Sequence, residues 1–161
     1  MKRIVSWCCL ICMLACSEAK NEVFYTTNYP IERVEALATL ADEETRLTQE
    51  QLQGEVLTSA PVKAGGNYRL DFNRFNGGEL YVTPETSQTP LVGSFTKTPG
   101  TRILIFSYVE IVDTAQISSW RSEEGENLVK LTFDLTSQYK ERYPDAAIEK
   151  VVREEYTTKP Y

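Results

Sequence analysis

The chain of 161 residues contains no histidine, and its four cysteines, Cys8, Cys9, Cys12 and Cys16, all lie near the N-terminus. The lack of histidine excludes Ser-His-Asp and Cys-His catalytic sites and zinc sites built on histidine. Because no cysteine follows Cys16, disulfides and thiolate clusters are excluded from the rest of the chain. The sequence therefore predicts no metal and no cofactor.

Long apolar runs are also lacking. The N-terminal run, residues 4–14, is about eleven residues long, whereas a membrane-spanning helix needs roughly 20. Basic Lys2 and Arg3 precede the run, and Ala15 and Cys16 follow it, an order typical of a secretory signal. Residues 13–16 (MLAC) are similar to a lipobox, whose cysteine thiol receives a diacylglycerol. A plain signal peptide is the alternative, but it would leave Cys16 as an odd, reactive thiol.

We therefore predict a lipoprotein signal peptide over residues 1–15 and a palmitate-type lipid anchor on Cys16. Of the 17 basic residues, two lie in this signal, which leaves 15 basic and 23 acidic residues and a net charge of −8. That charge argues against nucleic acid and against anionic lipid headgroups as partners.

Beyond a polar tether over residues 16–22, residues 23–161 are predicted to form one β-rich domain, because the chain has no linker and no internal repeat. Alternation of apolar and polar residues predicts strands at 68–72, 80–82, 91–96, 114–120 and 128–133, and residues 23–27 resemble a first strand. Residues 103–106 are apolar throughout, as in a central strand covered on both sides. Asn76-Gly77-Gly78 predicts a type I′ turn with positive φ at the glycine.

Two short helices are also predicted. Thr48 and Gln51 form a capping-box pattern that favours a helix over about 49–59, which Gly54 weakens by roughly 1 kcal/mol. Asp134 is placed to cap a second helix that ends before Pro144. Segments 31–40 and 147–157 fit either strand or helix. The expected fold class is α+β, mostly β, with a largely antiparallel sheet of about eight strands.

Carboxylates are the main catalytic chemistry left to this chain, as in glycosidases. Asp71, Glu79, Glu110 and Asp113 are candidates, but none lies in a motif, so we interpret them as solvated surface acids and expect no enzyme. With no histidine and no free thiol, stability should be nearly flat from about pH 6 to 8.

Several stretches (FYTTNYPIERVEA, APVKAGGNYRLDFNRFNGGEL, GSFTKTPG, DLTSQYKERYPDA and REEYTTKP) resemble uncharacterised lipoproteins of Bacteroidota-type bacteria. The resemblance covers residues 25–161, implies a single β-rich domain held at the outer membrane, and favours strand for both open segments. It assigns no functional residue other than Cys16. Acidic residues after the cysteine often mark surface export in such bacteria; Ser17-Glu18 fits in part, so the side of the outer membrane stays open.

The function expected from these features is a non-enzymatic structural or protein-interaction module of the cell envelope. It would be bound to the membrane through its lipid and would have another envelope protein as its partner. The alternative is a cell-surface β-domain that binds a glycan by stacking on Trp120, with Tyr81 on the same surface.

Replacement of the anchor residue, Cys16→Ser, should move the protein from the membrane fraction to the soluble fraction. Each buried acyl methylene contributes about 0.8 kcal/mol, and two or more chains give stable anchoring. Fractionation with a high-salt wash measures the change. Protein that still sediments with membranes after the wash would contradict the lipid anchor.

Overall fold

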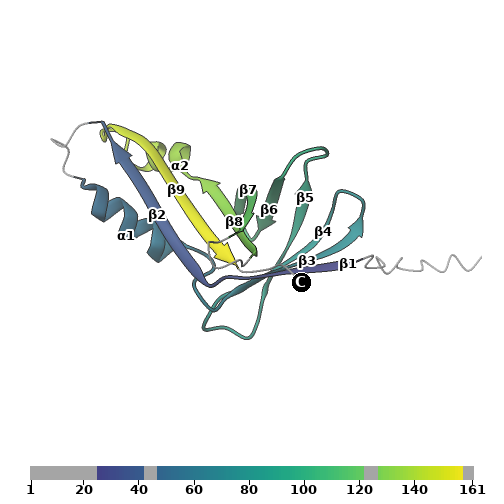
Figure 1. Ribbon diagram of the computed structural model, residues 1–161. Helices are drawn as coiled ribbons and strands as arrows, with labels where there is room; N and C mark the ends of the chain where they lie inside the picture. The colour runs from purple at the N-terminus through teal and green to yellow at the C-terminus, as the bar shows by residue number, and fades with distance from the viewer. Residues whose placement is uncertain (1–24, 42–46, 122–126, 158–161) are drawn as a thin grey trace, which may run out of the picture.

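The computed structural model describes residues 25–41, 47–121 and 127–157, which form one nine-stranded sheet and two helices (Figure 1). The strands are β1 (Tyr25–Pro30), β2 (Arg33–Leu40), β3 (Asn67–Arg74), β4 (Gly77–Thr83), β5 (Leu91–Lys97), β6 (Ile103–Tyr108), β7 (Ile111–Arg121), β8 (Asn127–Asp134) and β9 (Ile148–Thr157). The helices are α1 (Gln49–Ser59) and α2 (Thr136–Arg142), and neither is long and apolar enough to cross a membrane. The predicted α+β, mostly β class is confirmed.

The strand order is β1-β3-β4-β5-β6-β7-β8-β9-β2, and neighbouring strands pair antiparallel. β1 and β2 are consecutive in the chain but lie at opposite edges of this order. The two residues between them hydrogen-bond to both sides: Ile31 N donates to Gly66 O (2.8 Å), and Glu32 N donates to Tyr156 O (2.9 Å). The sheet therefore curls until its two edges meet at the Ile31–Glu32 corner.

Curling gives the sheet an inner and an outer face, and alternation along each strand decides which side chains lie inside. The inner side chains of β3, for example, are Tyr68, Leu70 and Phe72, all buried. Aromatic rings connect the strands across the interior, with the centroids of Tyr68 and Phe106 5.3 Å apart. Packing of these rings supplies the stability that a domain without disulfides requires.

The first helix forms where the sequence predicts it. Thr48 Oγ1 accepts from Gln51 N (3.2 Å), and Gln51 Oε1 accepts from Thr48 N (2.9 Å), so the capping box is confirmed. Leu52 and Val56 are the buried side chains of α1, and the helix packs against β2 and β9 (Figure 1). At α2 the predicted cap is wrong by one residue: Leu135 is the N-cap and no side chain caps the helix, although Asp134 Oδ1 accepts from Thr136 N (2.9 Å) just before it.

Both segments that fitted either helix or strand are strands. In β2, Val34, Ala36, Ala38 and Leu40 are less exposed than the residues between them, except for Glu35. β2 is an edge strand that pairs only with β9 among the described residues, from Arg33↔Tyr156 to Leu40↔Ile148. The pairing of these two segments decides the conformation of both, since neither has a strong local preference.

The predicted type I′ turn at Asn76-Gly77-Gly78 is wrong. The turn residues are Phe75 and Asn76, and both glycines belong to β4. Positive φ in the described residues occurs at Val109, Gly65 and Gly100, not at Gly77. A Cβ on Gly78 would lie 1.9 Å from the carbonyl oxygen of Asp71, so the glycine serves close approach of two strands at an irregular register, not a turn.

The prediction that residues 103–106 are covered on both sides is also wrong. β6 lies at the centre of the strand order, but of residues 103–106 only Leu104 and Phe106 are buried, and Ile105 is 37 % exposed. Both helices pack against the β2–β9 side of the sheet, so they leave the outer face of β6 uncovered. The apolar residues on both faces of β6 therefore indicate an exposed apolar surface and not a strand covered on both sides.

Gly78→Ala should destabilise the domain by about 1–3 kcal/mol, because the new methyl would overlap the backbone of β3. Gly54→Ala provides the matched control: nothing lies within 4 Å of that Cβ, so the helix should gain about 1 kcal/mol. Denaturant unfolding of both variants measures the difference. A Gly78→Ala protein as stable as wild type would contradict the register of β3 and β4.

Candidate functional site

The predicted site residues fall in different parts of the chain. Cys16 lies outside the described residues, and so does the side chain of Trp120. The backbone of Trp120 belongs to β7 and pairs with Leu128 of β8. Tyr81 is half-buried on β4, where its hydroxyl donates to Glu79 Oε2 (2.7 Å) and the Arg69 guanidinium lies 3.9 Å from its ring centroid. β5 and β6 separate the strands of Tyr81 and Trp120.

Two of the four candidate acids lie side by side. Asp71 and Glu79 are direct cross-strand partners in β3 and β4. Like charges in such a pair repel, and donors offset this: Asp71 accepts from Thr26 Oγ1 (2.9 Å) and pairs with Arg69 (3.2 Å). Asp71 is buried beneath these partners, so its interpretation as a solvated surface acid is wrong.

Asp113 is likewise buried and not a surface acid, whereas Glu110 is exposed in the β6–β7 turn. Asp113 Oδ2 accepts from Tyr108 OH (3.1 Å) and from a terminal nitrogen of Arg153 (3.2 Å). Arg153 Nε donates to Glu155 Oε1 (2.8 Å). Arg153 and Glu155 lie in no sequence motif and were not among the predicted site residues.

The buried ionic cluster consists of Tyr68, Tyr108, Asp113, Arg153 and Glu155. Tyr68 OH completes it by donating to Glu155 Oε1 (3.1 Å) from β3. The cluster spans the interior, since β3 and β9 are not neighbours in the sheet. One guanidinium faces two carboxylates, so the cluster carries an excess negative charge when both acids are ionised.

Burial is the largest influence on the pKa values of Glu155 and Tyr68. It raises the pKa of Glu155 to about 7, although Arg153 and the Tyr68 hydroxyl pull in the other direction. Burial and the nearby Glu155 also raise the pKa of the Tyr68 hydroxyl, which therefore remains a hydrogen-bond donor. Because Glu155 is fully buried, its titration affects the protein interior and not a site open to substrate.

Exposed aliphatic side chains gather at one end of β5, β6 and β7. This aliphatic patch consists of Leu91, Val92, Val109, Ile111 and Val112. Val109 is 75 % exposed and Val112 69 % exposed, and Tyr81 pairs with Val92 at the border of the patch. Leu91 and Ile111 pair with buried Val82 and Tyr108, so the patch surrounds the strand ends on both faces. Large exposed apolar surface is typical of interaction sites.

The backbone of the patch is strained at its tip. Val109 has φ +52°, a left-handed conformation that a β-branched residue adopts at a cost of about 1–3 kcal/mol. Glycine or asparagine would relieve this strain, yet the position holds an exposed valine. Strain kept at an exposed apolar residue supports a role in contact with another molecule rather than in folding.

No family model matches the chain, and neither the search of curated proteins nor the search of solved structures found a similar protein. In the described residues, no group of three or more acids could hold a metal ion. The aliphatic patch and its surroundings are therefore the main structural indication of a function.

The raised pKa of Glu155 replaces the expectation of flat stability near neutral pH. Between its ordinary value of 4.5 and about 7, the folded protein holds a proton that the unfolded chain releases. Stability should therefore fall as pH rises through this range and level off above it, by about 3 kcal/mol in all. Denaturant midpoints measured from about pH 5 to 8 test this.

Glu155→Gln should abolish the fall, since glutamine keeps an acceptor for Arg153 but does not titrate. Glu154→Gln is the matched control on the outer face of the same strand. Burial raises the pKa of Glu154, but the hydrogen bonds from Lys130 and Tyr156 together lower it by more, so the net shift is downward. The contribution of Glu154 to stability is therefore lost only at lower pH. A wild-type curve that is flat in this window would contradict the protonated Glu155.

Proposed function

We propose that the protein is a lipid-anchored, non-enzymatic module of the cell envelope that binds another envelope protein through the aliphatic patch. Cys16 would hold it at the outer membrane, as the N-terminal sequence predicts. The observation that carries the proposal is the exposure of five aliphatic side chains at one end of β5–β7. In water, burial of this surface against a partner is favourable.

The surroundings of the patch fit a protein interface. Tyr81 and Arg69 stack beside Val92, and tyrosine and arginine are enriched among residues that dominate binding energy. Glu79 and Asp71 follow along the same two strands. An apolar centre with a polar border is the usual arrangement of such interfaces.

The carboxylates support a non-enzymatic role. Glu79 accepts a hydrogen bond from Tyr81, and Asp71 is bound by Thr26 and Arg69. Both acids of this cross-strand pair therefore already have partners. A glycan-binding role has less support at Tyr81, because the Arg69 guanidinium covers one face of its ring. A sugar would have only the other face for stacking.

Val109→Asp should abolish partner binding without weakening the fold. Aspartate tolerates a positive φ better than valine does, so stability should stay the same or rise by up to about 1 kcal/mol. The charge would have to be desolvated at the interface, and binding should fall at least about tenfold. Chemical cross-linking in cells and purification of the native lipidated protein measure the recovered partner.

Gln116→Asp is the matched control, because Gln116 is exposed on β7 but lies outside the patch. It should leave the recovered partner unchanged. Recovery of the same partner with Val109→Asp would contradict the aliphatic patch as the interface. Binding to an immobilised glycan that survives Val109→Asp would favour the alternative function.

A further inference from the structure

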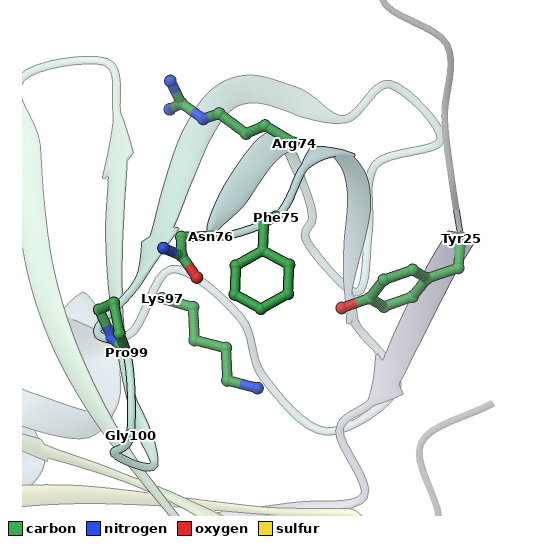
Figure 2. A pocket seen from close by; sticks show the side chains of 7 residues that line it. All are labelled: Tyr25, Arg74, Phe75, Asn76, Lys97, Pro99 and Gly100. Atoms are coloured by element: carbon green, nitrogen blue, oxygen red, sulfur yellow. The ribbon is translucent and has the colours of Figure 1, made fainter.

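The opposite end of the sheet carries an exposed aromatic group. Phe75, at the turn between β3 and β4, is 89 % exposed, and Tyr25, the first residue of β1, is 52 % exposed. Together with Lys97, Pro99 and other residues of the two turns they line an open hollow of about 430 Å³. Figure 2 shows both rings and the Lys97 side chain around this hollow.

The two turns that line the hollow are cationic, whereas the whole chain is acidic. Residues 72–78 and 96–104 contain Arg74, Lys97 and Arg102 but no aspartate or glutamate, whereas the chain has a net charge of −6. Figure 2 shows that Arg74 points away from the rings, so cations lie on more than one side of Phe75. Exposed aromatic rings with nearby cations are typical of contact with the headgroup region of a bilayer.

The position of the tether places this end near the lipid. Cys16 precedes Tyr25 by nine residues, which reach at most about 30 Å when fully extended. β6 separates the β5–β6 turn from the aliphatic tip at Val109, and its six residues span about 20 Å. The tether therefore joins the domain at the Phe75 end, so that this end can rest on the bilayer while the aliphatic patch faces away.

We propose that the Phe75 end rests on the bilayer in which Cys16 is anchored. This inference depends on the lipid anchor of the proposed function. Phe75 enters the headgroup region, and Arg74, Lys97 and Arg102 contact the phosphates of anionic phospholipids. The net negative charge of the chain argued against such lipids, but attraction at a surface depends on the local charge, since distant charges are screened. The contact orients the domain with the aliphatic patch facing away from the membrane.

The test places a fluorescent reporter at each end of the lipidated, full-length protein. Phe75→Trp and Val109→Trp are compared in vesicles of phosphatidylethanolamine and phosphatidylglycerol that contain acyl chains brominated near the headgroups. Both positions are exposed, so the fold should tolerate either ring, and thermal melts verify this. The wild-type emission, which includes Trp120, is subtracted.

The added emission of Phe75→Trp should be largely lost to the brominated lipid, and that of Val109→Trp should persist. Protein that floats with the vesicles but shows no quenching of Phe75→Trp, or shows quenching of Val109→Trp instead, would overturn this inference and leave the anchor intact. Protein that does not float at all would remove the anchor and the inference together. Equal quenching without phosphatidylglycerol would overturn the assignment to anionic lipids.

Discussion

The curled sheet depends on the contact of Arg153 with Asp113 and Glu155. Hydrophobic packing alone would allow the strands that face each other across the interior to shift relative to one another, since apolar contacts have little directionality. The guanidinium instead requires partners at fixed positions on β7 and β9, and Tyr68 adds a requirement on β3. Loss of Arg153 would leave two buried carboxylates without their cation, which is far more costly than the net gain from forming the pairs. The cluster therefore fixes which strands face each other across the interior.

Tyrosine is the polar aromatic residue that binds carboxylates in this protein, a role that histidine has in many others. Inside the sheet, Tyr68 and Tyr108 each donate to a buried acid. Outside, Tyr81 donates to Glu79, and Tyr156 donates to both Glu154 and Glu35. A tyrosine hydroxyl is an uncharged donor near neutral pH, so it satisfies a carboxylate without adding a charge that must be desolvated. In this way five carboxylates, Glu35, Glu79, Asp113, Glu154 and Glu155, gain a donor without another cation.

The order of elements could be predicted because most strands and both helices carry local signals. The capping box at Thr48 and Gln51 predicted α1, and alternation around Leu70 and Leu80 predicted a hairpin. The position of its turn could not be predicted, because the role of Gly78 is set by the backbone of a neighbouring strand. The buried cluster was missed for a similar reason. Arg153 and Glu155 look like ordinary surface charges in the sequence. Their burial follows from the pairing of β9 with β8 and with β2, and β2 is distant in the chain.

The Ile31–Glu32 corner has a consequence for how the protein is made. Among the described strands, β2 pairs only with β9, which begins more than a hundred residues after β2 ends. β2 therefore has no pairing strand until β9 is present. Such long-range pairing is slow and cannot begin before β9 has been synthesised. The chain therefore stays incompletely folded during synthesis. Export across a membrane, which the N-terminal sequence predicts, requires a chain that has not yet folded, and a topology completed only by β9 would meet this requirement.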